Sequence, residues 1–373
     1  IAPCFRDEDA RADRSPGEFY QLDIEMAFAT QEDVFAVLER VLPPVFAKFS
    51  GWEADRPPFR RIAYRDALET YGTDKPDLRN PLTVCDISDL MQGCGFGAVE
   101  GKTVKAIAVR NAGIARKQID KLAEEFKVKT EGGAMFWFKL DENGAPAGGI
   151  SKFVAERADA LKQRLGIAAG SFVAVLAEDK LALAQKRAGV LRTMLGTALD
   201  LLEKNVYRFC WIVDFPMYEI GEESGQLEFC HNPFSMPQGG MKALEEKDPL
   251  DVLAYQYDIV CNGVELSSGA VRNHDPEIMV KAFSLVGLGK EDVVKKFPAL
   301  YHAFEYGAPP HAGVAPGVDR MVMLISDTVN IREVIAFPMN AKARDLLMNA
   351  PSPVEQKQLD DVHIAVVMPE KKN

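Results

Sequence analysis

Two carboxylates, Asp258 and Glu265, flank the strongest turn signal in the chain, Asn262-Gly263. A two-residue turn there pairs Val260 with Glu265 and Asp258 with Ser267, so both carboxylates face one side of the predicted hairpin. They would lie diagonally, roughly 6–8 Å apart, and would repel each other unless a positive charge lay between them. A hard divalent cation bridging to phosphate oxygens suits such a pair. A solvated outer face is the alternative, and the apolar neighbours disfavour it.

Arg272 extends the same strand at the opposite parity. It follows Glu265 by seven residues, so an unbroken strand would point it to the other face. If Arg272 serves the same pocket, the strand must bulge or kink, most readily at Ser267-Ser268-Gly269. A planar guanidinium binds a carboxylate through two parallel hydrogen bonds, and a buried one selects an acid over an amide.

A second cationic position lies nearer the C-terminal end. A loop over Gly307–Gly313 precedes the sequence Gly317-Val318-Asp319-Arg320. The following apolar residues recur at helical spacing: Val318, Met321, Val322 and Ile325. This pattern predicts a strand, a turn and a helix with Arg320 in its first turn. A cation beside a helix N-terminus favours phosphate, although the short motif alone is weak evidence.

The start of the chain alternates strictly between two faces. One face carries Phe19, Gln21, Asp23 and Glu25, and the other is apolar, with Tyr20, Leu22, Ile24, Met26 and Phe28. A charged loop over Asp7–Glu18 precedes this strand, with Arg6 at its base. We therefore expect an antiparallel hairpin with cations at its base; a surface hairpin with solvated charges is the alternative.

The elements that must position these residues follow from spacing and capping. Thr30 is a typical N-cap for a helix whose apolar stripe is Val34, Val37, Leu38, Val41 and Leu42. Pro43-Pro44 is expected to interrupt that helix. Phe209–Pro216 reads as an apolar strand, and His231 follows it in the string Phe229–Phe234. A lone histidine is more often structural than ligand-binding.

Composition excludes several classes of protein. The 373 residues contain 47% hydrophobic residues and six scattered cysteines without a CxxC pair. A disulfide framework or a zinc site is therefore disfavoured, and a reducing cytoplasm fits. No signal peptide is expected, and the given sequence has no apolar run of membrane-spanning length. The net charge of −11 argues against non-specific nucleic-acid binding without excluding a tRNA partner.

Several strings resemble one family. FRDEDxRADR followed by EFxQLDxE resembles motif 2 of class II aminoacyl-tRNA synthetases, in the bacterial-type aspartyl form. Gly317–Arg320 resembles motif 3, and His231–Phe234 resembles the HHPF or HNPF segment, with Asn232 where many members have a second histidine. Tyr71–Arg79 also resembles this family, but its residues read simply as a charged turn.

The resemblance implies roles for individual residues. It implies Arg6 and Arg320 as catalytic residues, and Asp258 and Glu265 as ligands of Mg²⁺. The implied ATP-binding residues are Arg6, Asp7, Glu8, Arg14, Phe19, Glu265, Gly317, Val318, Asp319 and Arg320. The implied aspartate-binding residues are Arg6, Gln21, Asp23, His231 and Arg272.

The resemblance further implies an activity and partners. L-Aspartate would be activated with ATP to aspartyl-adenylate and transferred to tRNA(Asp), with charging of tRNA(Asn) left open. The chain starts at Ile1, inside motif 2, so the anticodon-binding barrel and motif 1 are expected upstream. A homodimer is expected for the full-length protein, and no membrane partner.

The implied fold is α+β, an antiparallel sheet flanked by helices with an inserted α+β domain. We expect a first catalytic part over 1–82, a bacterial insertion domain over 83–205, a second catalytic part over 206–345 and a C-terminal extension over 346–373. The glycines at Gly93, Gly95 and Gly97 lack the Lys-Ser/Thr of a phosphate-binding P-loop.

Two kinds of rival remain. An asparaginyl or lysyl enzyme, or an aspartate–ammonia ligase, shares the class, although a lysine pocket should be acidic where Arg272 stands. A binding or regulatory protein without turnover would keep the fold, but it would be expected to lose a motif arginine or the carboxylate pair, and all are present.

Overall fold

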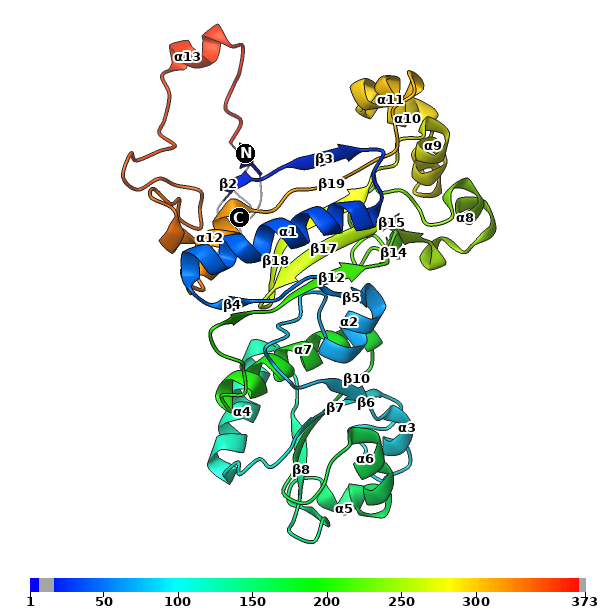
Figure 1. The fold of residues 1–373 in the computed structure, drawn as a ribbon, viewed down its shortest axis with the longest axis vertical. Helices are drawn as coiled ribbons and strands as arrows, with labels where there is room; N and C mark the ends of the chain where they lie inside the picture. Colours follow the sequence, from blue (N-terminus) through cyan, green and yellow to red (C-terminus); the bar gives the residue numbers. More distant parts are fainter. Residues whose placement is uncertain (7–16, 369–373) are drawn as a thin grey trace. The chain divides into compact units, whose positions relative to one another are not determined.

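The computed structural model describes residues 1–6 and 17–368 of the chain (Figure 1). Contacts divide the chain into two units, one formed by Ile1–Leu22 with Gly317–Asn373 and the other by Asp23–Pro316. The predicted site residues Asp7, Glu8 and Arg14 lie outside the described residues.

A six-stranded sheet forms the centre of the larger unit. Its strands, in spatial order, are β3 (Ile24–Ala27), β19 (His311–Val314), β18 (Val264–Val271), β17 (Gln256–Cys261), β12 (Phe209–Val213) and β5 (Arg60–Ala63). All neighbours pair antiparallel except β12 and β5, which are parallel. The expected antiparallel α+β architecture is confirmed.

One face of this sheet is covered by α1 (Gln31–Ser50), which Figure 1 shows in front of the strands. Phe35 of α1 stacks on Trp211 of β12, with ring centroids 3.9 Å apart. Buried Glu39 accepts hydrogen bonds from the Trp211 indole, the Phe59 amide and the Arg61 guanidinium, so its charge is compensated inside this layer.

The predicted break at Pro43-Pro44 is wrong, because α1 continues through both prolines to Ser50. Thr30 does begin the helix, and its amide and hydroxyl both donate to Asp33. Beyond the prolines the apolar stripe continues at Phe46, whose ring packs edge-on against Tyr207 and Phe209. This burial outweighs the local cost of proline inside a helix.

The predicted continuous strand at the start of the chain is also wrong. It is divided into β2 (Glu18–Gln21), which pairs with β1 (Ala2–Phe5), and β3, which pairs with β19. Leu22 and Asp23 belong to neither strand. The two ends of the expected apolar face, Tyr20 and Phe28, are exposed within the described residues.

A second sheet in the same unit is formed by the part of the chain between β5 and β12. It has five strands, in the order β6 (Val84–Asp86), β7 (Thr103–Val109), β10 (Phe172–Glu178), β8 (Phe136–Leu140) and β9 (Pro146–Ala147). Helices α4 (Arg116–Lys129) and α7 (Leu181–Ala198) pack on one face, and α3 (Ser88–Met91), α5 (Ser151–Val154) and α6 (Ala158–Leu165) supply core residues on the other.

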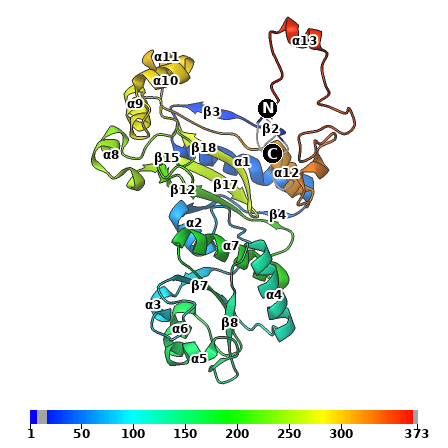
Figure 2. The same ribbon diagram turned by 180° about the vertical axis from the view of Figure 1, so that it is seen from behind.

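The five-stranded sheet and its helices contact the six-stranded sheet through α2 (Tyr64–Tyr71) and α7, which lie side by side in Figures 1 and 2. Gly72, which ends α2 with a φ of 69°, touches the backbone of Gly189 in α7, leaving no room for a Cβ on either residue. The contact fixes the chain that leaves α2, and this chain carries Lys75.

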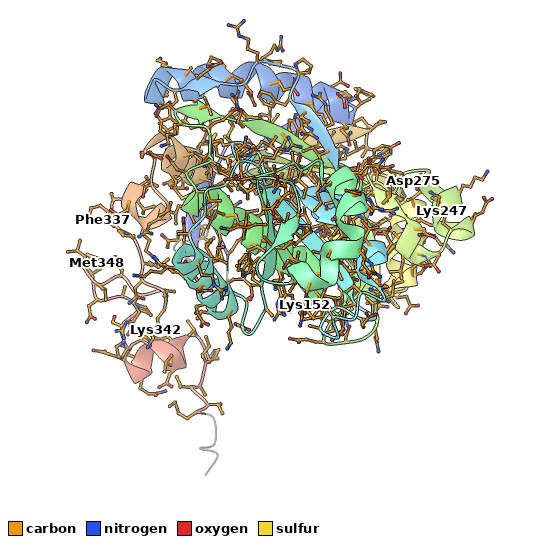
Figure 3. The ribbon with its side chains drawn as sticks, turned by 90° about the horizontal axis from the view of Figure 1, so that it is seen from below. Lys152, Lys247, Asp275, Phe337, Lys342 and Met348 are labelled. Carbon is orange, nitrogen blue, oxygen red and sulfur yellow. The ribbon has the colours of Figure 1, made fainter. Side chains whose placement is uncertain are left out.

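Smaller elements complete the larger unit. Paired short strands are β4 (Glu53–Ala54) with β11 (Val206–Tyr207), β13 (Phe215–Pro216) with β16 (Leu253–Ala254), and β14 (Tyr218–Ile220) with β15 (Leu227–Phe229). The remaining helices are α8 (Gly240–Glu246), α9 (Pro276–Leu285), α10 (Lys290–Lys296) and α11 (Pro298–Glu305). Asp275, labelled in Figure 3, caps α9 by accepting from two backbone amides.

The smaller unit contains β1, β2, α12 (Val318–Ile325), a 3₁₀ turn at Ile331–Val334 and α13 (Gln356–Asp361). The segment after α12 exposes Phe337 and Met348, whose side chains are labelled in Figure 3.

Replacing Gly189 with alanine tests the close contact between α2 and α7. Alanine inside a helix normally stabilises by roughly 1 kcal/mol relative to glycine. Here the added methyl group overlaps the Gly72 carbonyl, so we expect the free energy of unfolding to fall by roughly 2–4 kcal/mol. Urea unfolding followed by circular dichroism measures it.

Gly113→Ala is the matched control, because a Cβ there meets no atom within 4 Å. An unchanged unfolding midpoint in Gly189→Ala would contradict the contact.

Candidate active site

The hairpin of β17 and β18 turns at Asn262 and Gly263, whose φ angles of 50° and 84° are those of a type I′ turn. Cys261 pairs with Val264, and Val260 pairs with Glu265, as the sequence predicts.

Beyond that point the register shifts by one residue. Ser267 pairs with Ile259, and Ser268 pairs with Asp258, so the predicted pairing of Asp258 with Ser267 is wrong. Leu266 is the extra residue of a β-bulge, one position before the predicted Ser267–Gly269.

The bulge decides where Arg272 points. It reverses the alternation of β18, so Ser268, Ala270 and Arg272 share the face of Asp258 and Glu265. An irregularity before Arg272 is present, but its predicted place at Ser267–Gly269 is wrong, because the ladder is regular from Ser267 onward. The acid pair and Arg272 therefore lie on one face of one hairpin.

Asp258 is the buried member of the acid pair. It is 4% exposed, and its Oδ1 has no hydrogen-bond partner among the described residues. Burial, and then the nearby charge of Glu265, raise the pKa of Asp258 to about 8, against the smaller opposing effects of Ser268 and Lys75. A carboxylate in this setting needs a cation to stay ionised.

One cation is already present. Lys75 Nζ lies 3.3 Å from Glu265 Oε2 and 2.6 Å from Asp74 Oδ2. Sequence reasoning missed Lys75, because Tyr71–Arg79 read only as a charged turn. Its resemblance to family sequences was the one available signal, and no local spacing connects it with the hairpin.

Arg272 is held by a second carboxylate that sequence reasoning did not single out. Its Nη2 lies 2.5 Å from Glu25 Oε1, and its Nε lies 3.4 Å from Glu25 Oε2. Glu25 is opposite Gly313, which is opposite Ala270. A Cβ on Gly313 would overlap the Glu25 carboxylate, so this glycine leaves the space that Glu25 occupies.

His231 lies beside an aromatic pair. Its ring is edge-on to Phe215 at 5.2 Å and to Tyr64 at 6.0 Å. Partial withdrawal from water lowers the pKa of His231, an effect that Asp74 opposes and Lys75 reinforces. Asn232 instead shapes the backbone, since its Oδ1 accepts from the amide of Phe234.

The smaller unit assembles the other predicted residues. The Arg6 guanidinium lies over the Phe19 ring, 5.1 Å from its centroid. The Tyr20 amide donates to Asp319 Oδ2 at 2.7 Å, and Gln21 bridges to Gly317. These bonds attach β2 to the start of α12.

Gly317 is the N-cap of α12, so Val318, Asp319 and Arg320 form its first turn, as predicted. The N-terminal amides and Arg320 make this helix start suitable for an anion. The smaller unit thus holds Arg6, Phe19, Gln21 and Asp319 with the first turn of α12. In the larger unit, Asp258, Glu265 and Arg272 share one face of the β17–β18 hairpin. Convergence of the two sets on one cleft stays a prediction.

A magnesium site fits the acid pair by its chemistry. Hard cations prefer carboxylate oxygens, and Mg²⁺ commonly takes only one or two from the protein together with substrate phosphates. Oδ1 of Asp258 is a buried carboxyl oxygen without a hydrogen-bond partner in the part of the chain that the structure describes, so it could serve as such a ligand. Within residues 1–6 and 17–368, no group of three or more His, Cys, Asp or Glu side chains could hold a metal.

Comparison with known sequences decides the family. The model of class II tRNA synthetases (D, K and N) matches residues 1–341. The chain belongs to the class II tRNA synthetases. Within the described part of this synthetase chain, no helix has the length and apolarity needed to cross a membrane.

Curated relatives of this synthetase chain include bacterial proteins. It is 52% identical over 382 residues to the aspartate–tRNA(Asp/Asn) ligase of Gluconobacter oxydans, covering 100% of this chain and 63% of that protein. It is 53% identical over 374 residues to the enzyme of that name from Zymomonas mobilis, covering 99% and 63%. It is 50% identical over 374 residues to the aspartate–tRNA ligase of Streptomyces coelicolor, covering 100% and 63%.

The chain therefore spans about 63% of the length of these relatives. Among solved structures, an aspartyl tRNA synthetase from Entamoeba histolytica aligns with 91% of this chain and 46% of its own at 19% identity, with a TM-score of 0.43.

The raised pKa of Asp258 predicts a pH dependence of stability in metal-free buffer. Between about pH 4 and pH 8 the folded protein keeps a proton that the unfolded chain has lost. The free energy of unfolding should therefore fall as the pH rises through that interval, by up to roughly 1 kcal/mol per pH unit. Asp258→Asn should remove this decline, as measured by urea unfolding at several pH values.

Asp251→Asn, at an exposed position in a 3₁₀ turn, should keep the decline of the parent protein. Equal slopes for the parent and Asp258→Asn would show that Asp258 ionises normally.

Proposed function

We propose that this protein is an aspartate–tRNA ligase, which activates L-aspartate with ATP and transfers it to tRNA. One observation carries the proposal: the bulge at Leu266 places Arg272 on the face that carries Asp258 and Glu265. A guanidinium for a carboxylate and an acid pair for metal-bound phosphates then serve one reaction. The relatives described above are named as ligases of aspartate and tRNA, which supports the proposal.

The proposed nucleotide site consists of the residues that the resemblance implies for ATP. Arg6 would bind the α-phosphate and the aspartate α-carboxylate, and Phe19, already beneath the Arg6 guanidinium, would offer its ring to the base. Glu265, Gly317, Val318, Asp319 and Arg320 would complete the site, with Arg320 at the γ-phosphate. Asp7, Glu8 and Arg14, which lie outside the described residues, are proposed from resemblance alone.

Mg²⁺ would be held by Asp258 and Glu265 and, when bound, would neutralise phosphate charge. The chain's own task is then positioning: acid, nucleotide and compensating charges are fixed in place before the reaction.

The proposed aspartate site centres on Arg272. Its guanidinium is oriented by Glu25 and would bind the substrate side-chain carboxylate. Gln21 and Asp23 would face the α-ammonium group, and His231 would approach the substrate from beside Phe215.

In the first step, an aspartate carboxylate oxygen would attack the α-phosphorus of ATP and release pyrophosphate. In the second, the terminal ribose hydroxyl of the tRNA would attack the adenylate carbonyl and release AMP. No covalent enzyme intermediate is required.

The setting of the protein is also proposed. We infer tRNA(Asp) as a partner, with tRNA(Asn) a second candidate because some relatives carry both names. We further propose a homodimer in the cytoplasm. Residues 83–205 would form an insertion between the two catalytic parts, 1–82 and 206–345, and residues 346–373 would form a C-terminal extension.

Arg272→Leu tests the amino-acid site in the intact protein. Loss of the guanidinium should lower aspartate-dependent exchange of pyrophosphate into ATP at least about 100-fold, because the substrate carboxylate would lose its charged partner. ATP binding, measured separately by equilibrium dialysis, should change little.

Arg65→Leu, on the exposed side of α2, should retain full exchange. Exchange of the parent protein with neither aspartate nor asparagine would reject the proposed enzyme, and equal aspartate affinity in Arg272→Leu would reject the role of Arg272.

A further inference from the structure

A third ionisable side chain, Lys75, lies beside the acid pair Asp258 and Glu265, and the proposed function gives it no role. Lys75 Nζ lies against Glu265 Oε2 at 3.3 Å and against Asp74 Oδ2 at 2.6 Å. Only 26% of its side chain is exposed, so the ammonium is largely shielded from water. It touches the same carboxylate that a divalent cation would use.

The segment that carries Lys75 is anchored from the second sheet layer. Arg192 of α7 donates from Nε to the Leu82 carbonyl at 2.6 Å, and from Nη2 to the carbonyls of Asp77 at 2.9 Å and Asn80 at 2.7 Å. Asn80 returns a bond from Nδ2 to the Arg192 carbonyl at 3.0 Å. Lys75 is only two residues from the first of these anchored carbonyls.

Burying the Arg192 guanidinium costs desolvation free energy, which its hydrogen bonds must offset. Arg192 is 1% exposed, and among the described residues it forms no ion pair, only bonds to backbone carbonyls and a stack on the Tyr71 ring at 4.9 Å. A guanidinium withdrawn from water must be fully bonded to persist. Three of its hydrogen bonds hold the backbone of one short segment, from Asp77 to Leu82.

The other side of that segment touches the hairpin. A Cβ on Gly263, in the turn that joins the two acid-bearing strands, would lie 3.3 Å from the Cβ of Asp77. The Asp77 side chain is itself fixed by a two-pronged pair with Arg79. The segment thus fills the space between α7 and the turn, with its ammonium directed at the acid pair.

We propose that Lys75 is a resident cation of the acid pair, that Arg192 is its positioning residue, and that a divalent cation competes with Lys75 for Glu265. The inference rests on the proposed function, because the acid pair is assigned there as the metal site. While no metal is bound, the ammonium compensates the charge of Glu265, and it repels a second cation that approaches the acid pair.

Lys75→Met tests the competition through metal binding in the absence of nucleotide. Removing one positive charge within about 4 Å should tighten Mn²⁺ binding roughly tenfold, as measured by electron paramagnetic resonance of free Mn²⁺ in the intact protein. Lys75→Arg keeps the charge and should bind Mn²⁺ as the parent does. Lys242→Met, which removes an exposed lysine paired with Glu246, is the matched control.

The positioning role is tested on α7. Arg192→Met should tighten Mn²⁺ binding at least about threefold, because Lys75 loses its anchor. Arg187→Met, on the same helix but bonded to Glu178 and the Thr130 carbonyl, should leave it unchanged. The double variant Lys75→Met/Arg192→Met should match Lys75→Met alone, which a merely structural role of Arg192 would not produce. If Arg192→Met fails to fold, Asn80→Ala takes its place in the comparison.

Parental Mn²⁺ affinity in a folded Lys75→Met protein, or tightening in Lys75→Arg as well, would overturn the competition. Equal shifts in Arg192→Met and Arg187→Met would overturn the positioning. Aspartate-dependent pyrophosphate exchange in the parent protein distinguishes failure of this inference from failure of the proposed function. If the parent catalyses exchange but the variants bind Mn²⁺ with unchanged affinity, only this inference is rejected. If Mn²⁺ affinity shifts as expected but the parent catalyses no exchange, the proposed function is rejected.

Discussion

Two carboxyl groups on one face of a sheet are the constraint around which this structure is arranged. Asp258 and Glu265 come from adjacent strands, and Asp258 is nearly excluded from solvent. Such a pair is unfavourable by itself, so the surrounding elements must supply positive charge and fix its position. The Asn262-Gly263 turn sets the register of the two strands that carry the acids, and Lys75 compensates the charge of Glu265. Helix α1 packs on the opposite face of the sheet and holds these strands in place.

The sequence predicted the hairpin because its signals are local. Asn-Gly between apolar runs dictates the turn, and the turn dictates the first pairs. Parity then required an irregularity before Arg272 but could not locate it. Ser267–Gly269 looked the weakest part of the strand, whereas the extra residue is Leu266, which is 1% exposed. Burial of that side chain, which local pattern does not reveal, selects the position.

What the sequence did not reveal depends on contacts between distant segments. Glu25 meets Arg272 across 247 positions, and Lys75 meets Glu265 from a stretch with no periodicity. The helix through Pro43-Pro44 persists because Phe46 is buried against two aromatic rings. In the first strand, alternation correctly gave the extended conformation but not its division between two pairing partners. In α1, burial of apolar side chains stabilised the helix by more than the local conformational preference of the prolines cost.

The bulge at Leu266 makes the stretch between the second acid and the arginine sensitive to its length in a way that composition does not show. Loss of one codon there would leave hydropathy almost unchanged and would still permit a regular ladder. It would also turn the guanidinium away from the carboxylates and towards the layer packed by α1. Homologous genes should therefore tolerate exchanges of side chain in this stretch more readily than gaps in an alignment.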